Sequence, residues 1–539
     1  MIVSTQAPLL HWDRLSVPLP TGADRPHAVE NLSLDLRQNE VLCLVGESGS
    51  GKSVSAMATM GLLKGEMSQT SGAIRFAGQD LTKLSPDARR QLTGSKLSMV
   101  FQEPIASLNP FYTAGAQVSE TIRTHSDQPA AAIREKVLSL FEEVHLPNPE
   151  QIFRAYPHEL SGGQCQRVMI ASALALDPAV LIADEPTTAL DVTTQAQILS
   201  LMLALRDNHN TGILFITHDF GVVSEIADRV AVMRKGQLVE VGPREQILTD
   251  PQHDYTKALL AAVPKLAPRA ARPVQGKPIL EVSSVSKTYR TGNFLRKAGR
   301  EVKAVVDANI HIHGGETLGI VGESGSGKTT LSQCIIRMVE PTSGQVQIAG
   351  KDFLSLKGKE LRKARQRVQI IFQDPYTSLD PRQKVGDAIA EGPLIHGTDM
   401  REATKISHEL IEAVGLETAA ADRYPHEFSG GQRQRICIAR ALALQPDLLI
   451  ADESVSALDV SVQAQILDLL ADIQTQRGFA MLFVTHDLRV ASQICDRICV
   501  MQRGQIVETG APDQLFANAK EPYTRALLAA VPGANRVFG

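Results

Sequence analysis

The chain has 539 residues, of which 43% are hydrophobic and 21% charged. This length allows more than one domain, and the composition is that of a globular protein rather than a disordered or fibrous one. The formal net charge of −4 disfavours a nucleic-acid-binding protein that depends on a large basic surface.

The first informative element is an apolar run at 41–45 that is followed by a glycine-rich loop. The loop consists of Gly46, Glu47, Ser48, Gly49, Ser50, Gly51, Lys52 and Ser53. It fits the phosphate-loop pattern G-x-x-x-x-G-K-[ST], which connects a strand to a helix. The backbone N–H groups of such a loop turn inward around a phosphate. We therefore expect Lys52 to contact the β- and γ-phosphates of a nucleotide and Ser53 to offer a hydroxyl to Mg²⁺.

A turn of small residues and an acidic strand end follow. The turn is Ser161, Gly162, Gly163 and Gln164, and a helix that begins there would offer its N-terminus to an anion. Taken alone, this tetrapeptide is more often only a loop. The run at 179–183 leads into Asp184 and Glu185, where one carboxylate can hold Mg²⁺ and the next can take a proton from water. A solvated acidic pair is the alternative.

The same order of motifs occurs a second time. The matching residues are Gly322, Glu323, Ser324, Gly325, Ser326, Gly327, Lys328 and Thr329, then Ser429, Gly430, Gly431 and Gln432, and then Asp452 and Glu453. The repeat predicts two homologous domains, 1–264 and 279–539, which a proline-rich linker at 265–278 joins.

Both halves have the pattern of an α/β core. Short apolar runs suit strands of a parallel sheet that is covered on both faces, and longer mixed stretches, such as 130–144 and 195–208, suit helices between them. The runs lie at 41–45, 179–183, 213–217, 317–321, 448–451 and 481–485.

With these motifs in this order twice, the chain resembles the ATP-binding subunits of ABC transporters over nearly its whole length. The resemblance extends to Gln102 in FQEP, Gln373 in FQDP, the ALD segments at 189–191 and 457–459, and the histidines His218 and His486. It implies two tandem P-loop NTPase domains of the ABC type, each with a parallel-sheet core and a helical subdomain. ATP and Mg²⁺ are the implied cofactors.

The resemblance also implies how the sites are composed. The two domains pair head to tail within one chain, so that each ATP lies between one domain's phosphate loop and the other's SGGQ turn. One site then combines Lys52, Ser53, Gln102, Asp184, Glu185 and His218 with Ser429 to Gln432, and the other combines Lys328, Thr329, Gln373, Asp452, Glu453 and His486 with Ser161 to Gln164. The implied catalytic residues are Glu185, Glu453, His218 and His486, and the implied Mg²⁺ ligands are Ser53, Gln102, Asp184, Thr329, Gln373 and Asp452.

Some positions depart from the pattern of the family. Tyr289 suits the aromatic residue that stacks on adenine, but its match in the first half is Leu19. Cys165 stands where the second half has Arg433, and Ser454 stands where the first half has Pro186. No cysteine lies in 251–280 or after 499, so we expect no iron–sulfur cluster. The six cysteines form no Cys-X-X-Cys pair and are expected to be reduced thiols in the core.

A finer resemblance points to the peptide/nickel importer branch. The segments 102–110 and 373–381, and the repeated YT(K/R)ALLAAVP at 255–264 and 523–532, look like that branch, although the latter could be only amphipathic closing helices. The fused arrangement is similar to the single-chain ATPases of microcin C and related peptide importers, of the YejF type.

This resemblance implies a motor subunit that drives the uptake of peptides or peptide-like compounds. It would lie peripherally on the cytoplasmic face of the inner membrane. Its partners would be two integral membrane permease subunits, contacted by the helical stretches 102–161 and 373–429, and an extracytoplasmic peptide-binding protein, with no nucleic acid. The sequence itself shows no signal-peptide pattern and no stretch of the ~18 apolar residues that a membrane helix needs.

Two other classes of tandem ATPase are alternatives. A soluble ATPase that acts on the ribosome or on nucleic acid would carry a long, charged helical linker, whereas residues 265–278 are short and proline-rich. DNA repair or chromosome ATPases would need zinc-binding cysteine pairs or long heptad insertions, and the sequence has neither.

Overall fold

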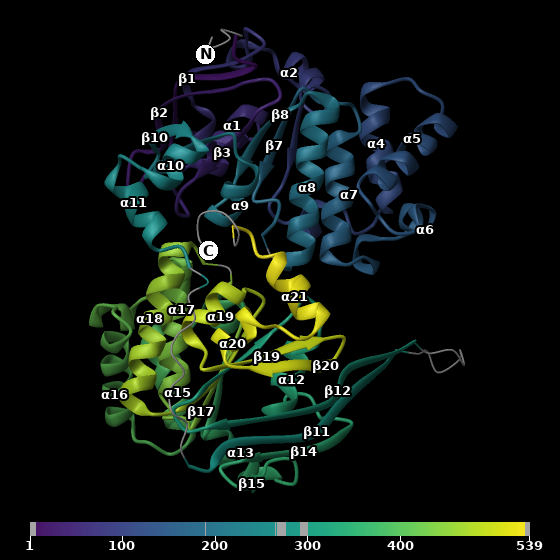
Figure 1. The fold of residues 1–539 in the computed structure, drawn as a ribbon. Coiled ribbons are helices and arrows are strands. Elements are labelled where there is room, and N and C mark those ends of the chain that lie inside the picture. Colours follow the sequence, from purple (N-terminus) through teal and green to yellow (C-terminus); the bar gives the residue numbers. More distant parts are fainter. Residues whose placement is uncertain are drawn as a thin grey trace. The chain divides into compact units, whose positions relative to one another are not determined.

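The structure, a computed structural model, describes residues 7–188, 190–264, 266, 276–291, 300–456 and 458–533 (Figure 1). Contacts between residues divide the chain into two compact units, and the chain passes from the first to the second between Val263 and Pro264. Most of the expected linker, 265–278, lies outside the described residues, as do Ala189 and Ala457 of the two ALD segments.

The main sheet of the first unit has six strands in the order β10-β9-β3-β8-β7-β6. All its pairings are parallel except that of β10 with β9. The strands are β3 (Val41–Val45), β6 (Leu97–Val100), β7 (Val180–Asp184), β8 (Gly212–Ile216), β9 (Arg229–Arg234) and β10 (Gln237–Pro243). Since β3, β7 and β8 are buried along their whole length, the apolar runs in the sequence are explained by cover on both faces. The three strands predicted here are confirmed to within one residue.

A second, antiparallel sheet in the order β2-β1-β4-β5 was not predicted. Its strands are β1 (Leu10–Pro18), β2 (His27–Leu36), β4 (Ser71–Phe76) and β5 (Gln79–Asp80). Its apolar side chains share one core with α1 (Lys52–Met60) and the main sheet. Within that core the Trp12 indole N–H donates to Thr59 Oγ1 at 2.9 Å, which ties the sheet to the helix that begins at the phosphate loop.

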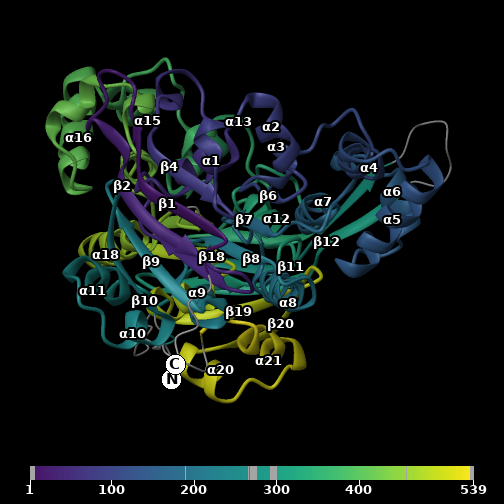
Figure 2. The same cartoon turned by 90° about the horizontal axis from the view of Figure 1, so that it is seen from above.

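The remaining helices of the first unit form a separate helical subdomain and a cover for the main sheet. In the subdomain, α4 packs against α5, α6 and α7, and Figures 1 and 2 show α4, α5 and α6 grouped away from β10 and α10. The helices are α2 (Pro86–Leu92), α3 (Pro104–Ser107), α4 (Ala114–His125), α5 (Ala130–Glu143), α6 (Pro149–Arg154), α7 (Gly162–Leu174), α8 (Val192–His209), α9 (Phe220–Ile226), α10 (Arg244–Thr249) and α11 (Asp254–Ala261), with short 3-10 turns η1 (Gly65–Ser68), η2 (Leu81–Lys83) and η3 (Pro157–Glu159).

The second unit repeats both sheets. The antiparallel sheet has the order β12-β11-β14-β15, and the main sheet has the order β16-β17-β18-β13-β19-β20. The strands are β11 (Pro278–Thr291), β12 (Arg300–His313), β13 (Thr317–Val321), β14 (Ser343–Ile348), β15 (Lys351–Asp352), β16 (Val368–Ile371), β17 (Leu448–Asp452), β18 (Ala480–Thr485), β19 (Arg497–Gln502) and β20 (Gln505–Gly510). The expected α/β fold, with a parallel core and a helical subdomain in each half, is therefore confirmed.

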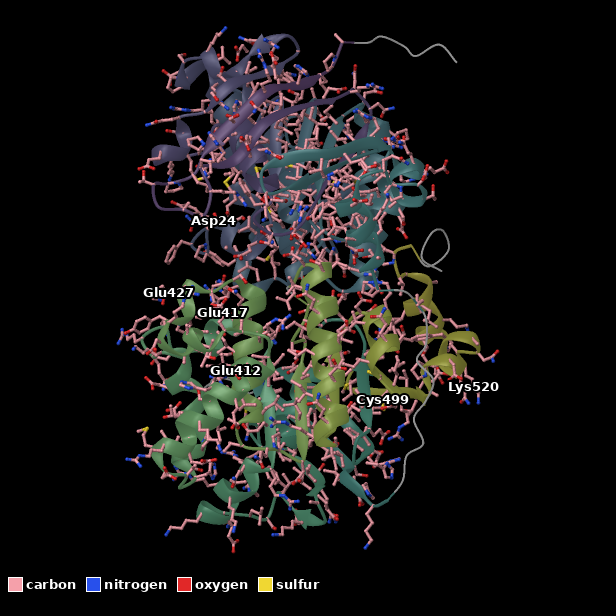
Figure 3. All side chains as sticks on the ribbon, turned by 90° about the vertical axis from the view of Figure 1, so that its left-hand side faces the viewer. Asp24, Glu412, Glu417, Glu427, Cys499 and Lys520 are labelled. Atoms are coloured by element: carbon pink, nitrogen blue, oxygen red, sulfur yellow. The ribbon has the colours of Figure 1, made fainter. Side chains whose placement is uncertain are left out.

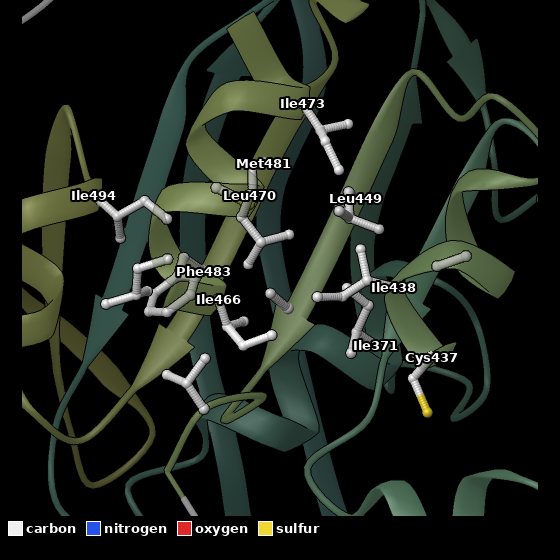
Figure 4. Close-up of a cluster of buried hydrophobic side chains, with 14 of the residues drawn as sticks. Ile371, Cys437, Ile438, Leu449, Ile466, Leu470, Ile473, Met481, Phe483 and Ile494 are labelled. Carbon is white, nitrogen blue, oxygen red and sulfur yellow. The ribbon is translucent and has the colours of Figure 1, made fainter. Parts of the chain in front are cut away.

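The helices of the second unit follow the same order as those of the first. They are α12 (Lys328–Ile335), α13 (Gly358–Gln366), α14 (Pro375–Ser378), α15 (Val385–Ile395), α16 (Met400–Ala413), α17 (Gly430–Leu442), α18 (Val460–Arg477), α19 (Leu488–Ile494), α20 (Pro512–Ala517) and α21 (Pro522–Ala529), with 3-10 turns η4 (Thr418–Asp422) and η5 (Pro425–Glu427). In Figure 4, Ile466, Leu470 and Ile473 of α18 lie among Leu449, Met481 and Phe483 of strands β17 and β18.

Polar and apolar side chains separate as in any globular domain. In the second unit, Glu412 and Lys520 lie exposed at the periphery, whereas Cys499 is buried (Figure 3). All six cysteines are buried free thiols. No helix in the described part of the chain has the length and apolar character that crossing a bilayer requires.

Candidate active site

Each glycine-rich loop connects a central parallel strand to a helix, the context that the motif requires. The loop residue Gly51 has a φ of +103°, and a Cβ there would lie 2.5 Å from the carbonyl oxygen of Ala28. At Gly327 the φ is +105°, and a Cβ would lie 2.2 Å from the oxygen of Ala304. Both positions therefore need glycine, because the antiparallel sheet passes directly over the start of the helix.

The loop lysines are buried inside the turns of their own loops. Lys52 Nζ donates to the carbonyl oxygens of Gly46 at 2.7 Å and of Glu47 at 2.9 Å. Lys328 Nζ makes the same two bonds, at 2.9 and 3.0 Å. Burial lowers the pKa of Lys328, and the nearby carboxylate of Glu453 partly offsets this effect by favouring the charged ammonium group. An ammonium group held among backbone amides at a helix N-terminus is suited to a phosphate chain.

A hydroxyl and a carboxylate meet beside each lysine. Ser53 Oγ donates to Asp184 Oδ1 at 2.9 Å, and Thr329 Oγ1 donates to Asp452 Oδ1 at 3.3 Å. Burial raises the pKa of both aspartates. Hydroxyl and carboxylate oxygens are the hard ligands that Mg²⁺ prefers, so the chemistry of this pair fits the predicted metal.

The predicted glutamine, glutamate and histidine come together because they follow neighbouring parallel strands. In the first unit, Gln102 follows β6, Glu185 follows β7 and His218 follows β8, and β7 lies between the other two strands. The carboxyl ends of parallel strands meet at one edge of a sheet, where ligands of α/β proteins commonly bind. The second unit repeats this arrangement after β16, β17 and β18.

The glutamates are held as ionised carboxylates. Gln102 Nε2 donates to Glu185 Oε2 at 3.0 Å, and His218 Nδ1 lies 3.3 Å from Glu185 Oε1. Burial alone would raise the pKa of Glu185, but the hydrogen bond and charge of His218 lower it to about 2. An ionised carboxylate at this position can accept a proton from water.

The second glutamate has the same neighbours. Gln373 Nε2 donates to Glu453 Oε2 at 3.0 Å, and His486 Nδ1 lies 3.6 Å from that oxygen. Both glutamates have a positive φ, +47° at Glu185 and +46° at Glu453. A left-handed conformation is uncommon for a glutamate and is typical of functional sites where the surroundings enforce it.

Comparisons with known proteins agree with this geometry. The family model described as ABC transporter matches residues 29–188 and 305–456, which include both phosphate loops and both acidic strand ends. The chain belongs to the ABC transporter ATP-binding family. A second family model, the C-terminal region of oligopeptide/dipeptide transporters, matches residues 239–290 and 507–537.

Relatives of this ABC protein match it almost from end to end. The glutathione import ATP-binding protein GsiA of Escherichia coli O157:H7 is 47% identical, and the alignment covers 97% of this chain and 89% of the relative. The peptidoglycan transport ATP-binding protein YejF of Agrobacterium fabrum is 48% identical, with 97% and 96% covered. A solved ATP-binding cassette in a dimeric post-hydrolysis state, bound to ADP and Pi, is 30% identical and matches 43% of this chain and 98% of that one, with a TM-score of 0.40. The chain is an ATP-binding ATPase with two ABC domains.

Each SGGQ turn of this ABC ATPase caps a helix of its helical subdomain. Ser161 Oγ accepts a hydrogen bond from the Gln164 N–H at 3.2 Å, and Gln164 Oε1 accepts one from the Ser161 N–H at 2.9 Å. Ser429 and Gln432 form the same reciprocal pair, at 3.4 and 3.0 Å. The side chains of the turn therefore fix its shape. At Gly162 and Gly430, no atom of the described part of the chain would lie within 4 Å of an added Cβ.

Two tyrosines that the sequence did not single out support the phosphate loops. The Tyr255 hydroxyl accepts a hydrogen bond from the Glu47 N–H at 3.3 Å, and the Tyr523 hydroxyl accepts one from the Glu323 N–H at 3.1 Å. Burial raises the pKa of Tyr255 to about 12. The signal was present in the repeated YT(K/R)ALLAAVP segments, whose tyrosines begin α11 and α21.

The departures predicted from the sequence have distinct surroundings. Tyr289 pairs with Val302 across β11 and β12, and its ring is exposed beside the Lys287 ammonium group. Leu19 occupies the matching place, where its N–H donates to the oxygen of Pro26 at 2.9 Å.

The other two departures are buried. Cys165 Sγ lies 3.5 Å from the oxygen of Pro157, whereas Arg433 donates to the oxygen of Pro425 and lies over the ring of Tyr376. Ser454 is buried, and its hydroxyl has no hydrogen-bond partner among the residues that the structure describes.

Proposed function

We propose that the chain is the motor subunit of an importer that takes up small peptides or peptide-like compounds. The observation that carries the proposal is the duplication, in one chain, of a complete set of phosphate loop, acidic strand end, glutamine and histidine. The importer branch is supported by the oligopeptide/dipeptide C-terminal match in both halves and by relatives named for glutathione import and peptidoglycan transport. Within that class, substrates of the microcin C type stay a prediction.

The chemistry at each site follows from its geometry. Lys52 and Lys328 would bind the β- and γ-phosphates of ATP, and Glu185 and Glu453 would take the proton of the attacking water. His218 and His486 would hold the glutamates in place. Mg²⁺, when bound, neutralises charge on the phosphates, and the residues that would hold it are Ser53, Gln102, Asp184, Thr329, Gln373 and Asp452.

Each hydrolytic site is proposed to be shared between domains 1–264 and 279–539. The SGGQ turns begin helices of 13 residues, whose N-termini would face the γ-phosphate bound by the other domain. The linker, 265–278, would keep the halves at a high local concentration. Closure on ATP and reopening after hydrolysis would then move the partner.

The implied partners are two integral membrane permease subunits and an extracytoplasmic peptide-binding protein. The chain would lie on the cytoplasmic face of the inner membrane, and stretches 102–161 and 373–429, which include the helical subdomains, would contact the permeases. The test is co-purification of the tagged full chain from solubilised membranes, followed by reconstitution of the purified complex in liposomes. We expect ATP-dependent uptake of short peptides, which Lys52→Ala/Lys328→Ala should abolish. If no integral membrane proteins co-purify, the chain is not an importer subunit.

Closure within one chain has its own test. The double variant Glu185→Gln/Glu453→Gln should bind ATP without hydrolysing it and should keep the mass of a monomer in light scattering with ATP and Mg²⁺. A shift to twice that mass would mean that the domains pair between chains.

A further inference from the structure

The loop that connects β1 to β2 in the first unit has a defined shape. The Leu19 N–H donates to the carbonyl oxygen of Pro26 at 2.9 Å, which closes the base of the loop. The Thr21 N–H donates to Glu66 Oε2, also at 2.9 Å. The antiparallel sheet passes directly over the start of α1, so these bonds hold Arg25, which lies within the loop, close to the phosphate loop.

The half-buried Arg25 guanidinium group is bonded to the phosphate loop itself. Its Nη2 donates to the carbonyl oxygen of Gly49, and its Nε donates to that of His27 at 3.0 Å. A guanidinium group carries five N–H donors, and within the described part of the chain these bonds use two of them. The other donors belong to a cation at the rim of a loop that is built for phosphate. Arginine binds phosphate oxygens through paired, charge-assisted hydrogen bonds.

The second unit has the opposite charge at this position. Arg25 stands three residues before the Ala-Val pair at 28–29, and Glu301 stands three residues before the Ala-Val pair at 304–305. The Glu301 carboxylate lies 3.9 Å from the guanidinium group of Arg290, its cross-strand neighbour. Because a carboxylate repels phosphate, the second unit has no counterpart of Arg25 at this position.

This difference in charge accompanies the difference at the expected adenine site. Tyr289 of the second unit pairs with Val302, the residue after Glu301. Leu19 of the first unit bonds to Pro26, the residue after Arg25. The unit that lacks the aromatic ring therefore has a cation beside its phosphate loop, and the unit that has the ring lacks the cation.

We propose that Arg25 binds a phosphate oxygen of the nucleotide at the first site, and that this contact replaces the stacking of adenine there. The first site then recognises mainly the triphosphate, whereas the second site, through Tyr289, also recognises the base. Hydrogen bonds from a cation to phosphate are among the stronger ones, and Leu19 offers the base only apolar contact. The two sites of one chain therefore differ in their selectivity for the base, whatever compound the importer carries.

The test uses full-length chains in which one site at a time binds nucleotide. Glu185→Gln/Glu453→Gln stops hydrolysis in both parent chains. Adding Lys328→Ala leaves the first site, and adding Lys52→Ala leaves the second. A fluorescent ATP analogue is displaced by ATP or by inorganic tripolyphosphate, each with Mg²⁺. We expect the affinity ratio of ATP to tripolyphosphate to be smaller at the first site than at the second, where Tyr289 stacks on the base.

Substitution of Arg25 then tests the residue itself. Arg25→Ala should weaken the binding of ATP and of tripolyphosphate to the first site by the same factor, about tenfold, as loss of a hydrogen bond to a charged group does. Arg25→Lys keeps the positive charge and should restore most of both affinities. Glu301→Ala is the matched control, and it should leave both affinities of the second site unchanged.

The other outcomes overturn the inference. If Arg25→Ala weakens ATP but not tripolyphosphate, Arg25 contacts the base or the ribose instead of a phosphate. If both affinities are unchanged while the melting temperature falls, Arg25 only ties its loop to the phosphate loop. Equal affinity ratios at the two sites, or a loss with Arg25→Lys as large as with Arg25→Ala, would also overturn it. If the parent chains bind no ATP, the assignment of the phosphate loops fails instead.

Discussion

The two nucleotide sites of this chain bury their lysines in the same way but support their acidic residues differently. At the first site, Thr188 Oγ1 donates to Glu185 Oε2 at 2.9 Å. At the second site the matching hydroxyl, Ser456 Oγ, donates to the backbone oxygen of Glu453 instead, also at 2.9 Å. The carboxylate that is expected to act as a base therefore has one hydroxyl donor more at the first site.

The aspartates show the opposite difference. Asp452 accepts a hydrogen bond from Thr329 and a second from Ser332 Oγ at 3.0 Å, whereas the residue that matches Ser332 in the first unit is Ala56. The first site thus gives its glutamate an additional hydroxyl donor. The second site gives the additional hydroxyl donor to the aspartate that is expected to serve Mg²⁺, and it places Lys328 Nζ 3.7 Å from Glu453 Oε1. Repeats with the same motifs can therefore differ in the orientation of single carboxylates, which motifs alone do not encode.

The largest effect is expected from removing both glutamates. Glu185→Gln/Glu453→Gln should lower ATP turnover by about 10²–10⁴-fold, the contribution that general acid–base groups typically make, while a fluorescent ATP analogue still binds. Phosphate release by the single variants sharpens the comparison, because unequal losses would show that the two sites do not turn over equally. Turnover near the wild-type level in the double variant would contradict the assignment of both bases.

The second-largest effect is expected in nucleotide affinity, where the two adenine sites should respond differently to substitution. Tyr289→Ala should weaken nucleotide binding by about 1–3 kcal/mol, the value of base stacking on an aromatic ring in other base-binding sites. Leu19→Ala should cost less, since an aliphatic side chain offers only apolar contact. Equal losses in a nucleotide titration would mean that another aromatic residue serves the first site.

The third test concerns Thr188, whose hydroxyl distinguishes the first site from the second. Thr188→Val keeps the shape but removes a hydrogen bond to a charged group, for which about 1.5 kcal/mol is typical, so turnover should fall roughly tenfold or less. Ser456→Ala is the control, because its hydroxyl does not reach the Glu453 carboxylate. The measurement is kcat at saturating ATP for Thr188→Val and for Ser456→Ala. Equal kcat values for the two variants would mean that the Thr188 hydroxyl does not make the first site different from the second.

The parts of the fold that the sequence predicted are those with local signals. Buried parallel strands such as β3 and β13 leave uninterrupted apolar runs, and a glycine-rich loop marks where each ends. The antiparallel sheet left no such signal, because β1 is interrupted by register shifts between Trp12 and Leu15, and Arg14 has a φ of +50°. Bulges of this kind break the alternation by which a half-exposed strand is recognised.

The candidate site divides in the same way. The motifs identified Lys52, Asp184 and their repeats, and the order of parallel strands then explains why Gln102 lies beside Glu185. The hydroxyl donors to individual carboxylates, and the tyrosines beneath the loops, depend on side-chain geometry between residues far apart in the chain. Such contacts leave no fixed spacing between residues in the sequence, so they become visible only in the three-dimensional structure.

The smallest effect is expected at those tyrosines, where the two units are most alike. Tyr255→Phe removes a neutral hydrogen bond to the phosphate-loop N–H of Glu47, which contributes about 0.5–1.5 kcal/mol on average, and the ring remains to fill its buried place. Nucleotide affinity should therefore fall only a few-fold, and Tyr523→Phe should have a similar effect at the second loop, because its bond is of similar length. Each variant is titrated with a fluorescent ATP analogue, and its melting temperature is measured. Together the two measurements distinguish a loosened phosphate loop from a loosened helix α11 or α21. If affinity is unchanged while the melting temperature falls, the tyrosines only hold α11 and α21 against their units and do not shape the phosphate loops.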